Sequence, residues 1–320
     1  MDKRIFQEKY TSYINNLKKV SNVFSIMYER NEGEVSIDTN TDILLEQTHS
    51  PVKGLIWKFS NRVLVMLTYK CLSNCRYCER QGRVGVGRDD ENELTEHEID
   101  EIISFLKKNK KIDEVIISGG DPLTHSNGLK YIAEKLSNLK QIRIIRIKTR
   151  VPLQDPEAVD LSLMTYISNL DKVCYLAVHV DHPDEFTQKS ISVITELRKM
   201  GYILLGQTIF LKGINDDYDI LFNLFSQMSQ LGIRPYYIYH CQELPNTMKF
   251  VLKLDIERQL MTKLREELSG IAFPMHVIDM QNTTGKVIVP THHWKVELDF
   301  VKNYSDQWYD LSINNIIKEQ

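Results

Sequence analysis

The 320-residue sequence has few cysteines, no apolar run long enough to span a membrane, and no low-complexity segment. Its five cysteines are too few and too unevenly placed for the disulfide framework of a small secreted protein. Lysine plus arginine (40) nearly balances aspartate plus glutamate (43), so nothing indicates a general binder of nucleic acid. The polar N-terminus lacks the apolar stretch of a signal peptide. With 42% hydrophobic and 26% charged residues, the sequence predicts a globular, cytoplasmic protein with no nucleic-acid or membrane partner.

Three of the cysteines lie within eight residues. Cys71, Cys75 and Cys78 follow the spacing C-x3-C-x2-C. A structural zinc ion normally takes four protein ligands, whereas three thiolates can hold three irons of a [4Fe–4S] cluster and leave the fourth iron open to a small molecule. The spacing therefore favours an iron–sulfur cluster. Zinc completed by a distant histidine or cysteine is the alternative.

Short β-branched runs alternate with segments of helical period from residue 62 onward. Strands are expected at 62–68, 115–118, 142–148, 173–180, 202–210, 234–239 and 275–279. Helices are expected at 98–108, 128–139, 160–170, 184–200, 217–231 and 256–268. Strand–helix alternation of this kind is typical of parallel strands with crossover helices. The sequence predicts an α/β fold, a partial (β/α) barrel, with a doubly wound open sheet as the alternative.

The chain divides into three expected parts. Residues 1–56 form an N-terminal extension that is mostly helical, with a weak helical period over 6–23. Residues 57–290 form the barrel core, and residues 291–320 form a C-terminal tail. In either architecture the chemistry should lie at the carboxyl ends of the strands. The cysteine loop does follow the first expected strand.

The cysteine spacing after a strand resembles that of the radical S-adenosylmethionine (radical SAM) superfamily. The turn Ser118-Gly119-Gly120-Asp121, after the second expected strand, resembles the glycine motif with which that family accepts the SAM amine. Two glycines allow a backbone to approach a ligand closely. The resemblance implies a radical SAM-type barrel, a [4Fe–4S] cluster, and SAM cleaved to a 5′-deoxyadenosyl radical. Gln207, inside an apolar strand, matches a family residue near SAM.

Further segments resemble one branch, the lysine 2,3-aminomutase family, over residues 58–289. They include Cys75-Arg-Tyr-Cys-Glu-Arg80, residues 201–216 (GYILLGQTIFLKGIND) and residues 234–241 (RPYYIYHC). The resemblance implies an isomerase that uses SAM, the cluster and pyridoxal 5′-phosphate (PLP). Such enzymes move the α-amino group of an amino acid to the β-carbon.

The same resemblance implies a PLP site. Lys286 matches the lysine that forms the Schiff base, and a lysine amine is the nucleophile that a carbonyl cofactor requires. Lys58 and Arg62 match the residues that bind the PLP phosphate, which an arginine can grip with two hydrogen bonds. The family loop before the lysine is glycine-rich. Here it reads Gln-Asn-Thr-Thr-Gly over 281–285, which is a departure from the family.

Four residues match the family's substrate site. Arg80 corresponds to the arginine that binds the substrate carboxylate, while Tyr239 could pack on the cofactor or belong to the core. Asp279 corresponds to one of two aspartates that hold the side-chain ammonium of lysine, while Gln242 stands at the other position. Keeping Asp279 favours lysine, arginine or a related side chain with a donor group, and disfavours glutamate.

The expected function is therefore a radical SAM, PLP-dependent amino-acid 2,3-aminomutase. The alternative is an enzyme of the same lineage that acts on a carrier-bound or protein-bound lysine, or on another amine. The expected partners are a small amino-acid substrate and an electron donor such as flavodoxin or ferredoxin, and the family also allows a homo-oligomer. The resemblance also implies further cysteines near the C-terminus that hold a structural zinc ion in the lysine enzymes. No cysteine follows Cys241 here, so no zinc is expected.

Overall fold

A curved sheet of nine strands forms the centre of the molecule in the computed structural model, which describes residues 3–38, 42–85, 93–280, 285–293, 300–302, 308–310 and 315–317. The strands are β3 (Leu55–Phe59), β4 (Arg62–Thr68), β5 (Glu114–Gly119), β6 (Ile144–Thr149), β7 (Val173–His179), β8 (Ile203–Ile209), β9 (Arg234–Tyr239), β10 (Met275–Asp279) and β11 (Lys286–Ile288). Strands β4 to β10 are parallel, and β3 and β11 pair antiparallel at the two edges.

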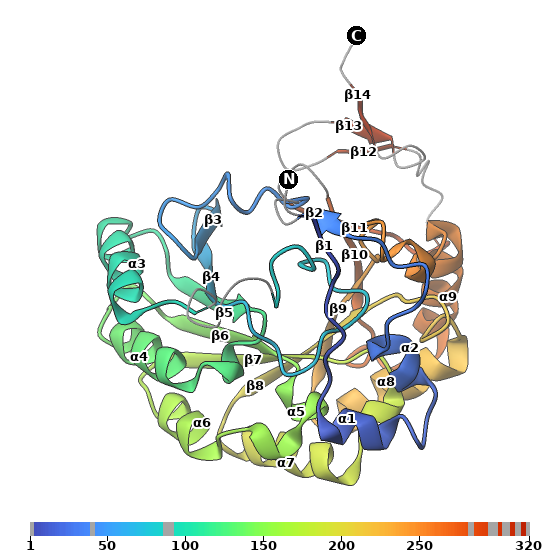
Figure 1. Cartoon of the computed structure of the whole chain (residues 1–320), viewed down its shortest axis with the longest axis horizontal. Coiled ribbons are helices and arrows are strands. Elements are labelled where there is room, and N and C mark those ends of the chain that lie inside the picture. Colours follow the sequence, from blue (N-terminus) through green and yellow to red (C-terminus); the bar gives the residue numbers. More distant parts are fainter. Residues whose placement is uncertain are drawn as a thin grey trace.

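The spatial order of the strands is their order in the sequence. Each crossover therefore moves one strand further in the same direction. Because such crossovers are right-handed, all the helices collect on one face of the sheet. Figure 1 shows these helices on the outside of the curved row of strands. The α/β partial barrel is confirmed. A doubly wound sheet, whose order reverses at a switch point, is excluded.

The outer layer contains α3 (Glu96–Lys108), α4 (Ser126–Ser137), α6 (Leu161–Ser168), α7 (Gln188–Lys199), α8 (Tyr218–Gln230) and α9 (Leu254–Glu267). Shorter elements are α5 (Val151–Gln154), η1 (Pro122–Thr124), η2 (Pro156–Ala158), η3 (Pro183–Glu185) and η4 (Met248–Phe250). The apolar faces of the outer helices pack on the sheet, where Ile99, Ile132 and Leu224 contact a core that includes Ile117 and Ile145.

The expected start of the fourth helix of the barrel, at Asp184, is wrong. Residues Pro183–Glu185 form a separate 3₁₀ turn, and α7 begins at Gln188. The cause is local: the side chain of Thr187 accepts a hydrogen bond from the backbone N–H of Ser190 and caps the helix there. The capping box of Thr95 and Glu98 before α3 is present, as the sequence predicts.

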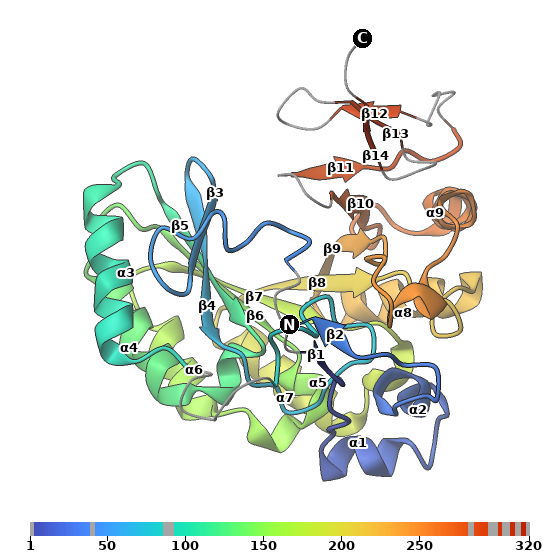
Figure 2. The same ribbon diagram turned by 45° about the horizontal axis from the view of Figure 1, so that its top comes forward.

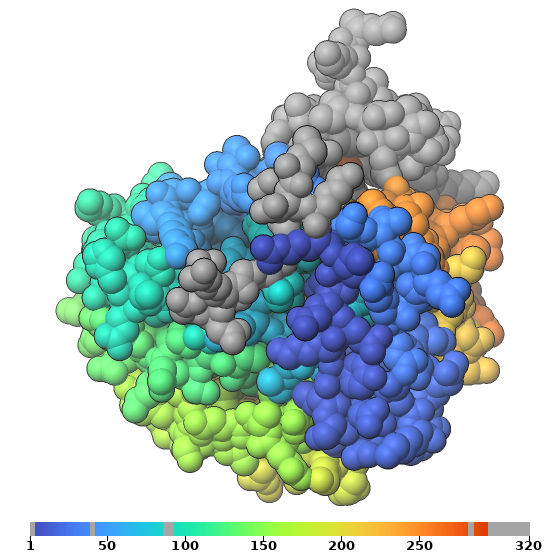
Figure 3. Space-filling model, viewed as in Figure 1, coloured from blue at the N-terminus to red at the C-terminus, as the bar shows by residue number. Residues whose placement is uncertain are grey.

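The N-terminal extension packs on the cysteine loop. It contains β1 (Lys3–Arg4), α1 (Ser12–Leu17), α2 (Val23–Tyr28) and β2 (Ile37–Asp38), so its helices differ from the single weak period expected over 6–23. A second core joins Phe24 and Met27 of α2 to Tyr77, Leu211 and Phe250. In Figure 3 the N-terminal residues, in blue, spread over the face toward the viewer.

Near the C-terminus, β12 (Phe300–Lys302), β13 (Trp308–Asp310) and β14 (Asn315–Ile317) form an antiparallel three-stranded sheet, visible in Figure 2. Across the described residues, no helix has the length and apolar character needed to cross a membrane.

Candidate active site

One cavity of about 610 Å³ brings together all fifteen of the predicted site residues. Its size is ordinary for a cofactor or substrate site. The lining includes Cys71, Cys75, Cys78, Ser118, Gly119, Gly120, Asp121, Gln207, Lys58, Arg62, Arg80, Tyr239, Gln242, Asp279 and Lys286. Most of them lie at or just beyond the carboxyl ends of parallel strands, as the fold predicts. Shared lining places these residues together, and the individual roles stay predictions.

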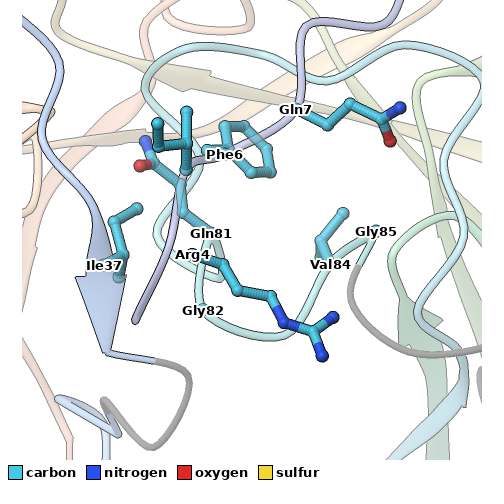
Figure 4. Close-up of a pocket in the computed structure, with 9 residues that line it drawn as sticks. Arg4, Phe6, Gln7, Ile37, Gln81, Gly82, Val84 and Gly85 are labelled. Atoms are coloured by element: carbon cyan, nitrogen blue, oxygen red, sulfur yellow. The ribbon is translucent and has the colours of Figure 1, made fainter. Parts of the chain in front are cut away.

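A smaller hollow lies between β1, β2 and the loop that follows the cysteines. Figure 4 shows Arg4, Phe6, Ile37 and Gln81 around it. Its volume of about 30 Å³ has room for one or two water molecules. A cofactor or an amino acid cannot enter a space of that size.

The three clustered cysteines sit on the loop after β4 and line the cavity with free thiols. Burial, followed by neighbouring negative groups, raises the pKa of Cys71 well above its usual value and that of Cys78 to about 12. Cys75 accepts hydrogen bonds from Arg150 Nη1 (3.3 Å) and Gln154 Nε2 (3.7 Å). Enclosed sulfur donors of this kind suit an iron–sulfur cluster, whose positive irons favour the thiolate form.

Arg150 links the cysteine loop to the next strand ends. Its guanidinium donates to Asp181 (2.9 Å), to Glu185 (2.7 Å) and to the Tyr77 hydroxyl. The pKa of Asp181 is lowered: burial opposes this, and the charges of His179 and Arg150 outweigh burial. A buried cation with two carboxylate partners fixes the geometry around Cys75.

The two glycines after β5 allow that strand to pass close to the entrance of the cysteine loop. Gly119 has φ of 138°, and a Cβ there would lie 2.0 Å from the Thr68 carbonyl oxygen. A Cβ on Gly120 would lie 2.2 Å from the carbonyl oxygen of Lys70. The N–H groups of Gly120 (2.6 Å) and Asp121 (2.7 Å) donate to those two carbonyls. Glycine is therefore required by backbone contact, independently of any ligand.

Asp121 connects the ends of β5 and β6. Its carboxylate accepts hydrogen bonds from the Thr149 hydroxyl (2.8 Å) and from the backbone N–H of Arg150 (2.7 Å) and Leu123 (3.1 Å). Burial raises the pKa of Asp121 to about 6, although these hydrogen bonds act in the opposite direction. Asp121 thereby fixes the strand ends beside the cysteines.

Lys286 and Asp279 are register partners on β11 and β10, and their side chains form an ion pair. The Lys286 ammonium lies 5.6 Å from the centre of the Tyr239 ring. Gln207 donates to the Tyr239 hydroxyl (3.0 Å), and Gln242 donates to the backbone carbonyl of Asp279 (2.7 Å). Residues 281–284 of the loop before Lys286 lie outside the described residues.

Arg80 is already paired with two carboxylates. Glu46 accepts from its Nε (3.3 Å) and Nη2 (2.5 Å), and Glu79 accepts from its Nη1 (2.8 Å). The two cations predicted to bind a phosphate have partners as well: Arg62 stacks on Phe59, and Lys58 donates to the Leu44 carbonyl. Burial, the largest effect, lowers the pKa of Lys58.

Among the charged residues of the cavity that the sequence reasoning did not identify are Glu46, Arg146 and Lys148. Arg146 pairs with Glu114 through Nε (2.9 Å). A signal for two of them was available, because Arg146 and Lys148 alternate with Ile145 and Ile147 along β6, whose isoleucines are buried. No local pattern marks Glu46, which comes before the first strand that the sequence predicts, at 62–68.

The model of the Radical SAM superfamily matches residues 65–224, half of the chain. The chain belongs to the radical SAM superfamily. This radical SAM protein also has the fold of a solved radical SAM methyltransferase from Sphaerobacter thermophilus, with a TM-score of 0.53 at 13% identity over 70% of this chain and 68% of that one.

The curated relatives of this radical SAM protein confirm the resemblance to lysine 2,3-aminomutases. L-lysine 2,3-aminomutase of Clostridium subterminale is 31% identical over 78% of this chain and 59% of the relative. The enzyme of the same name from Methanococcus maripaludis is 29% identical over 82% of this chain and 61% of the relative. The chain spans about three fifths of the length of the curated relatives it matches.

Membership of the superfamily implies a [4Fe–4S] cluster and SAM, and the residues present fit both. Cys71, Cys75 and Cys78 supply three sulfur donors on one wall of a cavity large enough for further ligands. Cys75 already accepts hydrogen bonds from two buried side chains, as cluster sulfurs commonly do. The backbone at Ser118 and Gly119 borders the same space, so a small ligand in the cavity can reach it.

Proposed function

We propose that this radical SAM enzyme is a PLP-dependent 2,3-aminomutase of an amino acid with a donor-bearing side chain, such as lysine or arginine. The observation that carries the proposal is the joint placement of Lys286 and the three cysteines on the walls of one cavity. The Lys286 amine, which would bind the carbonyl cofactor, and the cysteine thiolates, which would hold the cluster, can then act on one bound substrate. When bound, PLP would supply the conjugated ring that stabilises a radical next to the migrating nitrogen.

The chain's own residues prepare this chemistry. Asp279 holds the ammonium of Lys286 and fixes its position above the Tyr239 ring. Lys58, on the edge strand β3, and Arg62, on the neighbouring strand β4, are the candidates for the phosphate. Leu44 and Ile56 are buried parts of the same wall, which keeps water from the reacting carbon.

Substrate choice follows from charge. Once the substrate amine takes the place of Lys286, Asp279 would face the side chain of the bound amino acid. A carboxylate at that position favours an ammonium or guanidinium group on the substrate. A glutamate side chain would meet this carboxylate without a counter-charge. Gln242, whose amide is tied to the Asp279 carbonyl, adds no second negative charge.

The test is an anaerobic incubation of reconstituted protein with SAM, PLP, reductant and one amino acid at a time. Lysine, arginine, ornithine, glutamine and glutamate are compared, and β-amino isomers are separated by mass-resolved chromatography. We expect an isomer from lysine or arginine and none from glutamate. 5′-Deoxyadenosine without any isomer would contradict the aminomutase and favour the same lineage acting on a carrier-bound or protein-bound lysine.

Lys286→Ala should remove the visible absorption of lysine-bound PLP and abolish isomer formation, because the variant lacks the amine that is proposed to bind the cofactor. The absorption spectrum of PLP-loaded protein measures this directly. Lys199→Ala is the matched control, since Lys199 is exposed on α7 and pairs with Glu196. Retention of the band in the Lys286 variant would contradict the assignment.

The cytoplasmic location, a flavodoxin or ferredoxin as electron donor, and assembly into a homo-oligomer stay predictions. The division into an extension (1–56), a barrel core (57–290) and a tail (291–320) is likewise proposed. Limited proteolysis, with the cleavage sites identified by mass spectrometry, tests these boundaries.

A further inference from the structure

Two side-chain donors converge on the sulfur of Cys75, the middle cysteine of the three. Arg150 Nη1 lies 3.3 Å from Cys75 Sγ, and Gln154 Nε2 lies 3.7 Å from it. Both donors come from the chain just beyond β6: Arg150 follows the strand directly, and Gln154 ends the short helix α5. Arg150 therefore places a full positive charge in hydrogen-bond contact with a residue that fits as a cluster ligand.

The guanidinium of Arg150 is held in place by two carboxylates. Nη1 also donates to Asp181 (2.9 Å), and Nη2 donates to Glu185 (2.7 Å). These carboxylates are themselves fixed, because Asp181 accepts from the Tyr77 hydroxyl (2.6 Å) and Glu185 accepts from the backbone N–H of Asp181 (2.7 Å). The network therefore orients the donor toward the sulfur before a cluster is bound.

This network lies away from solvent. The Arg150 side chain is 5% exposed, and those of Asp181 and Glu185 are 0% and 1% exposed. Met27 of the N-terminal extension covers the guanidinium, with its sulfur 3.8 Å from Nη2. A charge in such surroundings acts on a neighbouring group more strongly than the same charge in water.

A cation beside a ligand sulfur affects the reduction potential of an iron–sulfur cluster. Taking up one electron converts [4Fe–4S]²⁺ to [4Fe–4S]⁺ and adds one negative charge to the cluster and its thiolates. The electron comes from a low-potential one-electron donor. A hydrogen bond from a cation to a ligand sulfur stabilises the more negative of the two states.

We propose that Arg150 is a positioning residue that acts through Cys75 to raise the reduction potential of the cluster and so favour its reduced state. Gln154, a neutral donor at a longer distance, contributes less. The inference depends on the cluster that membership of the superfamily implies, and depends neither on PLP nor on the substrate. The alternative is that Arg150 only holds the cysteine loop in place, and the reduction potential separates the two roles.

The test is an anaerobic redox titration of the whole chain reconstituted with iron and sulfide, in the absence of SAM, PLP and amino acid. The electron paramagnetic resonance signal of the reduced cluster gives the midpoint. Arg150→Met removes the charge, and we expect it to shift the reduction equilibrium about tenfold away from the reduced cluster, which is about 59 mV to lower potential. Arg150→Lys keeps the charge and should shift the equilibrium less.

Arg76→Met is the matched control for Arg150→Met. Arg76 is also a buried arginine of this region and pairs with Glu34, but its guanidinium donates to Glu34 and to two backbone carbonyls of the N-terminal extension. Its loss should lower the iron content, because the cysteine loop loses support, without moving the midpoint of the clusters that form. This is the result expected of a purely structural arginine.

Glu185→Gln provides a second test that keeps Arg150, in case Arg150→Met does not fold. It removes one of the two negative charges beside the guanidinium, while Asp181 still holds Nη1. We expect a shift in the opposite direction, toward the reduced cluster, because less negative charge then opposes the extra electron.

Three results would overturn the inference: an unchanged midpoint in Arg150→Met, an equal shift in Arg150→Lys or Arg76→Met, and a midpoint in Glu185→Gln that is unchanged or lower. If the expected shifts appear but no β-amino isomer forms from any amino acid, the proposed function alone is contradicted, because the titration requires no turnover.

Discussion

Lys148 shows, at the scale of single residues, what alternation along a strand can reveal. In β6 the isoleucines at 145 and 147 are buried against the helices, and Arg146 and Lys148 point to the other face. Charged residues inside a central parallel strand indicate a polar cavity on that face. The pattern cannot tell which of the two charges has an internal partner. Glu114, which pairs with Arg146, comes from a neighbouring strand.

At the scale of elements, the sequence predicts the interior of the barrel better than its edges. The strands from 62–68 to 275–279 and their helices are present, since long apolar periods are strong signals. The edge strands β3 and β11 were not expected. β11 has three residues, and β3 gains its partner through an antiparallel return into β4. The three residues of β11 are too few to show a period.

The glycine turn after β5 gives a prediction at this scale. Gly120→Ala would place a Cβ 2.2 Å from the Lys70 carbonyl oxygen, so the backbone before Cys71 must shift. We expect the variant to fold, because the clash is confined to the place where the end of β5 meets the start of the cysteine loop. We also expect it to hold less than half of the normal iron and sulfide. Iron and sulfide analysis of reconstituted protein measures the loss, with circular dichroism as the check on folding.

Gly201→Ala is the comparison for that variant. Gly201 has a φ of 92°, but a Cβ there meets nothing within 4 Å. It should cost stability without changing the cluster content of the folded protein. Full iron content in the Gly120 variant would show that the cysteine loop tolerates the displacement.

At the scale of the whole molecule, the cysteine loop depends on the first forty residues of the chain. Arg76, between two of the cysteines, is fully buried and pairs with Glu34. The backbone N–H groups of Asn74 and Arg76 donate to the carbonyls of Lys9 (2.7 Å) and Met27 (2.8 Å). Contacts between residues so far apart in the sequence leave no local signal. The sequence therefore predicts the cysteine loop but not the N-terminal residues that hold it in place.

Phe24→Ala tests this dependence. Phe24 is 1% exposed in the second core, which also contains Tyr77 of the cysteine loop. The truncation should lower the free energy of unfolding by about 3–5 kcal/mol, measured by urea denaturation. It should also lower the iron content of the protein that remains folded, because the loop loses the surface that holds Tyr77 in place.

Phe225→Ala separates the two effects, since Phe225 is equally buried but lies in the main core between the sheet and α8. Its loss of stability should be similar, and its iron content per folded chain should stay normal. Equal iron contents in the two variants would mean that the extension stabilises the fold in general. A selective loss in the Phe24 variant would mean that residues far from the barrel set the geometry of the cluster loop.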